Sequence, residues 1–113
     1  MAVSKSIPSQ QRGEAKAIIE RFNREVLGGG EVRYAARFKG LYLYLDRIDF
    51  SGAEMVPICR LKFTGEATGW QFAIYKYSRD RYDPDEAWFW GYEKVDGTIE
   101  GALCAGLAAY PPG

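Results

Sequence analysis

The chain has 113 residues, of which 47% are apolar and 27% are charged, a composition typical of a folded globular domain. Fifteen lysines and arginines balance fifteen acidic residues, so the net charge gives no general attraction to nucleic acid or to a membrane surface. No apolar run approaches the roughly 20 residues of a membrane span. We expect one α+β domain over residues 1–113, with residues 1–7 as a flexible N-terminus, in the cytoplasm.

The first predicted element is a helix from about Pro8 to Leu27, because apolar residues recur there at three- and four-residue spacing. Ser6 or Ser9 is expected to cap its start, and the glycine run 28–30 is expected to end it. The apolar stripe of this helix consists of Ala15, Ile18, Ile19, Phe22 and Val26.

After residue 31 the apolar period changes to two, which predicts β-strands. A turn is expected near Gly40 and a loop at 51–54. In the third strand we expect Cys59, Leu61 and Phe63 to face the core, whereas Ile58 is expected to face outward. The four predicted strands span 32–39, 41–46, 57–63 and 70–77. Short connections between consecutive strands favour an antiparallel meander.

The segment after the fourth strand is harder to assign. A polar loop is predicted at 78–86, and the aromatic run at 87–92 is compatible with a fifth, edge strand or with a loop. Trp88, Phe89, Trp90 and Tyr92 are expected to complete the core, as large rings usually do. If some of them stay exposed, they would instead form a shallow aromatic cleft for a peptide or small ligand.

A second helix is predicted at 99–109, with Thr98 as its N-cap and two prolines after its end. Gly101 and Gly106 disfavour a helix by about 1 kcal/mol each, so close packing is expected to hold it. Both helices need a sheet surface for their apolar stripes. The predicted fold is therefore α+β, an antiparallel meander of four to five strands with the N-terminal and C-terminal helices packed on one face.

The cysteines and the acidic residues do not indicate a catalytic or metal site. Cys59 and Cys104 are predicted to be free, buried and inert, as expected in a reducing cytoplasm. The chain contains no histidine, and Asp46 and Asp49 are expected on opposite faces of one strand. The acidic segment 80–86 lacks the spacing of a calcium loop. We predict no enzyme, no catalytic residue, no metal and no cofactor.

The outward positions of the predicted strands collect basic and tyrosine residues on one face of the sheet. Such a face suits a solvated surface on which arginine stacks on tyrosine, or a surface for a protein partner or for self-association as a homodimer. We predict a non-enzymatic protein-interaction module; the alternative is a single-stranded nucleic-acid platform, which the neutral net charge disfavours. We call this set the Tyr/Arg face: Arg33, Arg37, Tyr42, Tyr44, Arg60, Lys62, Tyr75 and Tyr77.

Overall fold

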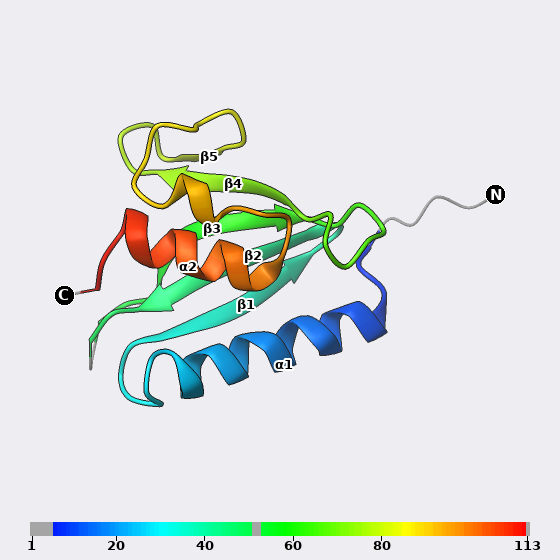
Figure 1. The fold of residues 1–113 in the computed structure, drawn as a ribbon, viewed down its shortest axis with the longest axis horizontal. Coiled ribbons are helices and arrows are strands. Elements are labelled where there is room, and N and C mark those ends of the chain that lie inside the picture. Colours follow the sequence, from blue (N-terminus) through cyan, green and yellow to red (C-terminus); the bar gives the residue numbers. More distant parts are fainter. Residues whose placement is uncertain (1–5, 51–52, 113) are drawn as a thin grey trace.

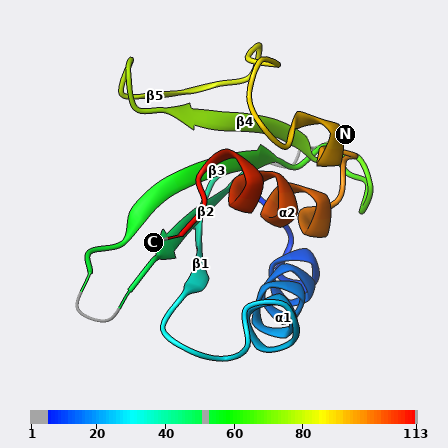
Figure 2. The same ribbon diagram turned by 60° about the vertical axis from the view of Figure 1, so that its left-hand side comes forward.

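The computed structural model describes residues 6–50 and 53–112. Their elements, in chain order, are α1 (Ser9–Glu25), β1 (Arg33–Lys39), β2 (Tyr42–Ile48), β3 (Val56–Lys62), β4 (Gln71–Lys76), β5 (Arg81–Asp83), the short 3₁₀-helix η1 (Tyr92–Lys94) and α2 (Ile99–Ala109). The strands form one antiparallel sheet in the order β1-β2-β3-β4-β5. Figure 1 and Figure 2 show α1 and α2 together on one face of this sheet. The predicted α+β fold is confirmed.

Helix α1 packs on β1 with a shorter apolar stripe than expected. Ile19 and Phe22 are buried, but Val26 is 58% exposed, because it is the C-cap residue beyond the last turn that packs on the sheet. Pro8 occupies the N-cap position and no side chain caps this end. The predicted serine cap is therefore wrong, since the helix begins too late for Ser6 and too early for Ser9 to stand at the N-cap.

Ile7 belongs to the core, although the sequence placed it in a flexible N-terminal segment. Its side chain is 1% exposed, and its backbone N–H donates to the carbonyl of Gly40 at 3.0 Å. The chain before α1 is thus tied to the β1–β2 turn from Ile7 onward. Residues 1–5 of the expected flexible segment lie outside the described residues.

A β-bulge in β3 changes which residues face the helices. The pairing between β2 and β3 shifts between Leu45 and Asp46, and Ile58 and Cys59 are consequently both buried. The expectation that Ile58 faces outward is wrong, because a bulge turns two consecutive side chains toward one face. A β-carbon at Gly106 would lie 2.6 Å from Cγ2 of Ile58, so this glycine lets α2 lie directly on the bulge.

Helix α2 occupies the predicted residues and has the predicted cap. The Thr98 hydroxyl accepts a hydrogen bond from the Gly101 N–H at 3.0 Å. A β-carbon at Gly101 would collide with Asp96, and one at Gly106 would lie 2.5 Å from the hydroxyl oxygen of Tyr34. The interpretation that close packing holds this helix is confirmed.

The fifth strand lies earlier than the aromatic run that the sequence suggested. β5 pairs with β4 over residues Arg81–Asp83, inside the segment predicted to be a polar loop. The aromatic run itself is irregular and leads into η1. Of the loop predicted at 51–54, residues 51 and 52 lie outside the described residues.

The two cysteines differ in their exposure. Cys59 is fully buried, and burial raises the pKa of its thiol well above the ordinary range. Cys104 is only partly buried, packed against the edge of the core cluster. The prediction of two buried cysteines is therefore correct for Cys59 and wrong for Cys104, since α2 turns its buried glycine and alanine side toward the sheet.

We expect Cys59 to react with a thiol reagent only when the protein unfolds. In a Cys104→Ala variant, the disulfide reagent DTNB should label no thiol in the native state and one thiol in denaturant. Because the folded pKa of Cys59 lies above its unfolded value of about 8.5, its contribution to stability should be complete below that pH and decline above it. Rapid labelling of the native variant would contradict the buried position.

Candidate functional site

The Tyr/Arg face lies on the side of the sheet opposite the helices. Register pairs place its residues side by side, because directly paired residues of antiparallel strands point to the same face. Arg37 pairs with Tyr44, Tyr44 pairs with Arg60, and Tyr75 pairs with Tyr82. The strand alternation thus brings basic and aromatic side chains from five strands onto one surface.

At the β1–β2 side, Arg37 is fixed by two contacts. Its guanidinium carbon lies 4.5 Å from the ring centroid of Tyr44, and its Nε donates to Oδ2 of Asp46 at 3.0 Å. This hydrogen bond raises the pKa of Arg37 above its ordinary value, against the opposing effect of burial. Asp46 is 8% exposed, so a carboxylate within the protein largely neutralises the positive charge of Arg37.

The centre of the face carries cations that the protein itself does not neutralise. Arg60 lies between two rings, 4.6 Å from the centroid of Tyr42 and 5.4 Å from that of Tyr82. Lys62 pairs with Tyr42 across the sheet and is exposed. Tyr42, Arg60 and Lys62 border a hollow of about 180 Å³ together with the edge of Pro84. Among the described residues, neither Arg60 nor Lys62 forms an ion pair.

Four tyrosines form a connected row beside these cations. The ring centroids are 5.3 Å apart for Tyr44 and Tyr82, 5.0 Å for Tyr82 and Tyr75, and 4.9 Å for Tyr75 and Tyr77. The interplanar angles are 62°, 72° and 78°, so each ring stands edge-on to the next. The row therefore offers ring edges and hydroxyl groups more than parallel ring faces.

Hydrogen bonds hold the β4 end of the row. The Tyr75 hydroxyl bonds to the Asp80 carboxylate, and the Tyr77 hydroxyl donates to the carbonyl of Pro57 at 2.7 Å. Tyr77 also meets the ring of Tyr110 edge-on, at 5.2 Å between centroids. Tyr77 nevertheless stays 51% exposed, so this end of the face combines fixed geometry with free surface.

The sequence identified most of this surface but missed two members, Tyr82 and Asp46. One predicted residue, Arg33, lies apart from the connected rings: it is exposed at the end of β1, opposite Ile48. Tyr82 was missed because it lies in a segment that reads as a polar loop, although Arg81, Tyr82 and Asp83 do alternate. Asp46 was missed because its residue type suggests at most a possible acid; the structure makes it the partner of Arg37. The six members linked by ring, cation–π or hydrogen-bond contacts are Arg37, Tyr42, Tyr44, Arg60, Tyr75 and Tyr77.

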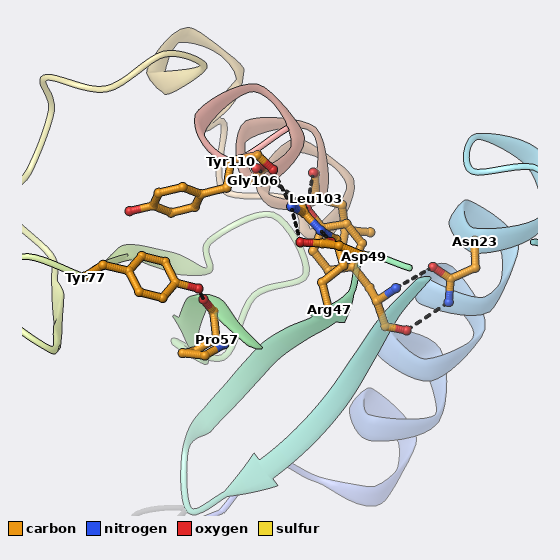
Figure 3. A network of polar contacts seen from close by, with 9 residues as sticks. Asn23, Arg47, Asp49, Pro57, Tyr77, Leu103, Gly106 and Tyr110 are labelled. Atoms are coloured by element: carbon orange, nitrogen blue, oxygen red, sulfur yellow. Dashed lines mark hydrogen bonds and ion pairs between the residues drawn. The ribbon is translucent and has the colours of Figure 1, made fainter. Parts of the chain in front are cut away.

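Behind the face, a buried arginine joins the sheet to α2 (Figure 3). Arg47 is 0% exposed and forms an ion pair with Asp49. Its guanidinium also donates to the carbonyls of Gly106, at 3.4 Å, and Tyr110, and to the hydroxyl oxygen of Tyr34 at 3.3 Å. Burial alone would lower the pKa of Arg47, but the contacts with Asp49 and Tyr34 outweigh it and raise the pKa.

This arginine neutralises the carbonyl end of α2, which has no basic residue of its own in its last turn. A cation at that end satisfies free carbonyls and opposes the helix dipole. The signal is present in the sequence, since Arg47 continues the inward alternation of Leu43 and Leu45. It is easily overlooked, because charged residues are rarely fully buried.

Tyr34 extends the network to α1. Its hydroxyl donates to the carbonyl of Leu103 at 2.8 Å, and the side-chain amide of Asn23 bonds both the N–H and the C=O of Tyr34, at 2.8 and 2.9 Å. Burial raises the pKa of Tyr34 far above its ordinary value. One polar network therefore connects both helices to the strands that carry the Tyr/Arg face.

The acidic segment near β5 is mostly engaged within the protein. Asp80 accepts from Tyr75, Asp83 lies 3.7 Å from Arg81, and Glu86 pairs with Lys76. Within residues 6–50 and 53–112, no cluster of three or more potential metal ligands is found. No helix in the same part of the chain is long and apolar enough to cross a membrane.

Comparison with known proteins finds no matching protein family, no matching curated protein and no matching solved structure. The function proposed below therefore depends on the geometry and chemistry of this surface.

Proposed function

We propose that this chain is a non-enzymatic binding module whose Tyr/Arg face docks an acidic surface of a partner protein. One observation carries the proposal: Arg60 and Lys62 border a hollow beside the row of four edge-on tyrosines, and neither has an ion-pair partner among the described residues. Arginine and tyrosine are enriched in protein interfaces. Tyrosine has only two side-chain torsion angles, so it loses little conformational entropy on binding.

The charge of the face favours a foreign acidic partner over a second copy. Arg33, Arg37, Arg60 and Lys62 lie on this side of the sheet, and Asp46 is already paired with Arg37. Two such faces pressed together would bring like charges into contact, which opposes association. Homodimerisation through the face is the rival outcome, and sedimentation velocity decides between them: we expect a monomer at micromolar concentration and moderate salt.

Single-stranded nucleic acid is the second candidate, since the same unpaired cations suit phosphate. The ring geometry argues against it. Base stacking needs accessible ring faces, whereas Tyr44, Tyr75 and Tyr82 stand edge-on to one another and the ring of Tyr44 also contacts Arg37. A labelled oligonucleotide should show no salt-sensitive binding by fluorescence anisotropy. Binding that weakens steeply with salt would replace the protein-partner proposal. For a single strand, the logarithm of the binding constant should then fall with the logarithm of the salt concentration by a slope of about −0.7 per phosphate contact.

We expect substitutions in the face to weaken binding of a labelled acidic probe, a peptide of alternating glutamate and leucine. Tyr44→Ala or Arg60→Ala should each cost about 1–2 kcal/mol of binding free energy, measured by anisotropy. The matched control is Arg24→Ala, which removes the same charge from the exposed side of α1 and should leave binding unchanged. Equal losses from Arg60→Ala and Arg24→Ala would show that only net charge matters and would refute a specific face.

A further inference from the structure

Two tryptophans project from the loop between β5 and η1, the uppermost segment of Figure 1. Trp88 is 94% exposed and Trp90 is 86% exposed, whereas the sequence led us to expect these rings in the core. Together with Ala87 and Phe89 they border a hollow of about 400 Å³, a volume in the range of ligand sites. Exposed apolar patches rimmed by polar residues mark interaction sites.

The loop holds the two tryptophans outward. Phe89, between them in the sequence, turns inward and stacks on Phe72, with 5.8 Å between centroids and 22° between planes. The backbone N–H of Trp88 donates to Oε1 of Glu86 at 2.8 Å. Gly91 has a φ of 102° and lies so close to α2 that a β-carbon there would be 2.6 Å from Cβ of Ala108. The exposed rings therefore project from an anchored segment.

The chain segment that carries the pair is acidic in sequence. Residues 83–93 contain four carboxylates and no basic residue, and Lys94 follows them. Glu86 is paired with Lys76. The hydrogen bonds that its carboxylate accepts from Lys76 and from the backbone N–H of Trp88 lower the pKa of Glu86. Asp85 and Glu93 are exposed and form no ion pair among the described residues. Asp85 lies shortly before Trp88 in the sequence, and Glu93 lies shortly after Trp90.

We propose that Trp88 and Trp90 form a second binding site, separate from the Tyr/Arg face, which takes an arginine or lysine side chain of a short basic peptide segment. Tryptophan is the preferred aromatic partner of a cation. The carboxylates of Asp85 and Glu93, three residues before Trp88 and three residues after Trp90 in the sequence, add long-range attraction. Two tryptophans bury roughly 300–500 Å², well below the roughly 800 Å² per partner of a stable dimer. The area therefore fits a short segment better than a second copy.

The test is fluorescence anisotropy at low salt with a labelled nonapeptide of alternating arginine and glycine. Trp88→Ala and Trp90→Ala should each weaken binding about three- to tenfold. The double variant Asp85→Asn with Glu93→Gln should weaken it and reduce its salt dependence. Both tryptophans are exposed, so these variants should keep the far-ultraviolet circular dichroism of the parent.

Three controls test whether the tryptophan pair itself binds the basic peptide. Phe50→Ala, which removes another exposed ring, and Arg60→Ala, which alters the Tyr/Arg face, should leave the affinity unchanged. Any binding of a glutamate–glycine peptide should be the same in the parent and in both tryptophan variants. Acidic-peptide binding that the tryptophan variants weaken as much as arginine-peptide binding, or unchanged arginine-peptide affinity in both tryptophan variants, would overturn the proposal. So would tryptophan-dependent cosedimentation with phosphatidylcholine vesicles, or self-association that the tryptophan variants abolish, which would assign the rings to a membrane or to a second copy.

Discussion

Replacing Arg47 with alanine should destabilise the protein by about 3–5 kcal/mol, because it removes the buried partner of a partly buried ion pair and a donor to the end of α2. The change leaves the Asp49 carboxylate without its cation and the carbonyls of Gly106 and Tyr110 without their donor. A loss of this size is a large part of the roughly 5–15 kcal/mol expected for a whole domain. Urea denaturation followed by circular dichroism measures it directly.

Two further variants identify the cause of that loss. Arg33→Ala removes an exposed arginine from the neighbouring strand and should change stability by no more than about 0.5 kcal/mol. Asp49→Ala combined with Arg47→Ala should cost less than the sum of the single changes, because the two residues share one interaction. Additive effects would show that the ion pair does not carry the stability of this region.

Replacing Phe22 with alanine should also cost about 3–5 kcal/mol, since it removes a large core ring and leaves a cavity. Phe22 is 5% exposed and meets the Tyr34 ring edge-on at 6.0 Å. It therefore links α1 to β1, one of the strands that carry the Tyr/Arg face. The midpoint of denaturant unfolding should fall without a change in the slope of the transition.

The same helix supplies the control for this prediction. Val26 was expected in the apolar stripe with Phe22, but it is 58% exposed. Val26→Ala should therefore alter stability by less than about 0.5 kcal/mol. If Phe22→Ala were as mild as Val26→Ala, the packing of α1 on the sheet would be wrong.

Local patterns in the sequence were sufficient for most of the fold. The period-two runs predicted four strands and the side of the sheet that carries Arg37, Tyr44 and Arg60, because successive strand residues point to opposite faces. The Thr98 cap predicted the start of α2 at Ile99. These features depend on residues within a few positions of each other, which a sequence displays directly.

Features that depend on distant partners were not predictable in the same way. Ile58 faces inward because of a bulge set by pairing with β2. Tyr82 joins the tyrosine row only because β5 pairs with β4. Arg47 is buried because α2, far along the chain, brings its carbonyl end to the same point.

The sequence by itself determined the α+β class, the order of the main elements and the basic, tyrosine-rich character of the open face, since these follow from periodicity and composition. Only the tertiary structure decided which cations of that face form ion pairs. It pairs Arg37 with Asp46 and leaves Arg60 without an ion pair among the described residues. It also decided which aromatic rings stay in water: Phe72 offers a packing surface to Phe89, and the tryptophans on either side are left exposed. Burial depends on which distant surfaces meet, and no local pattern contains that information.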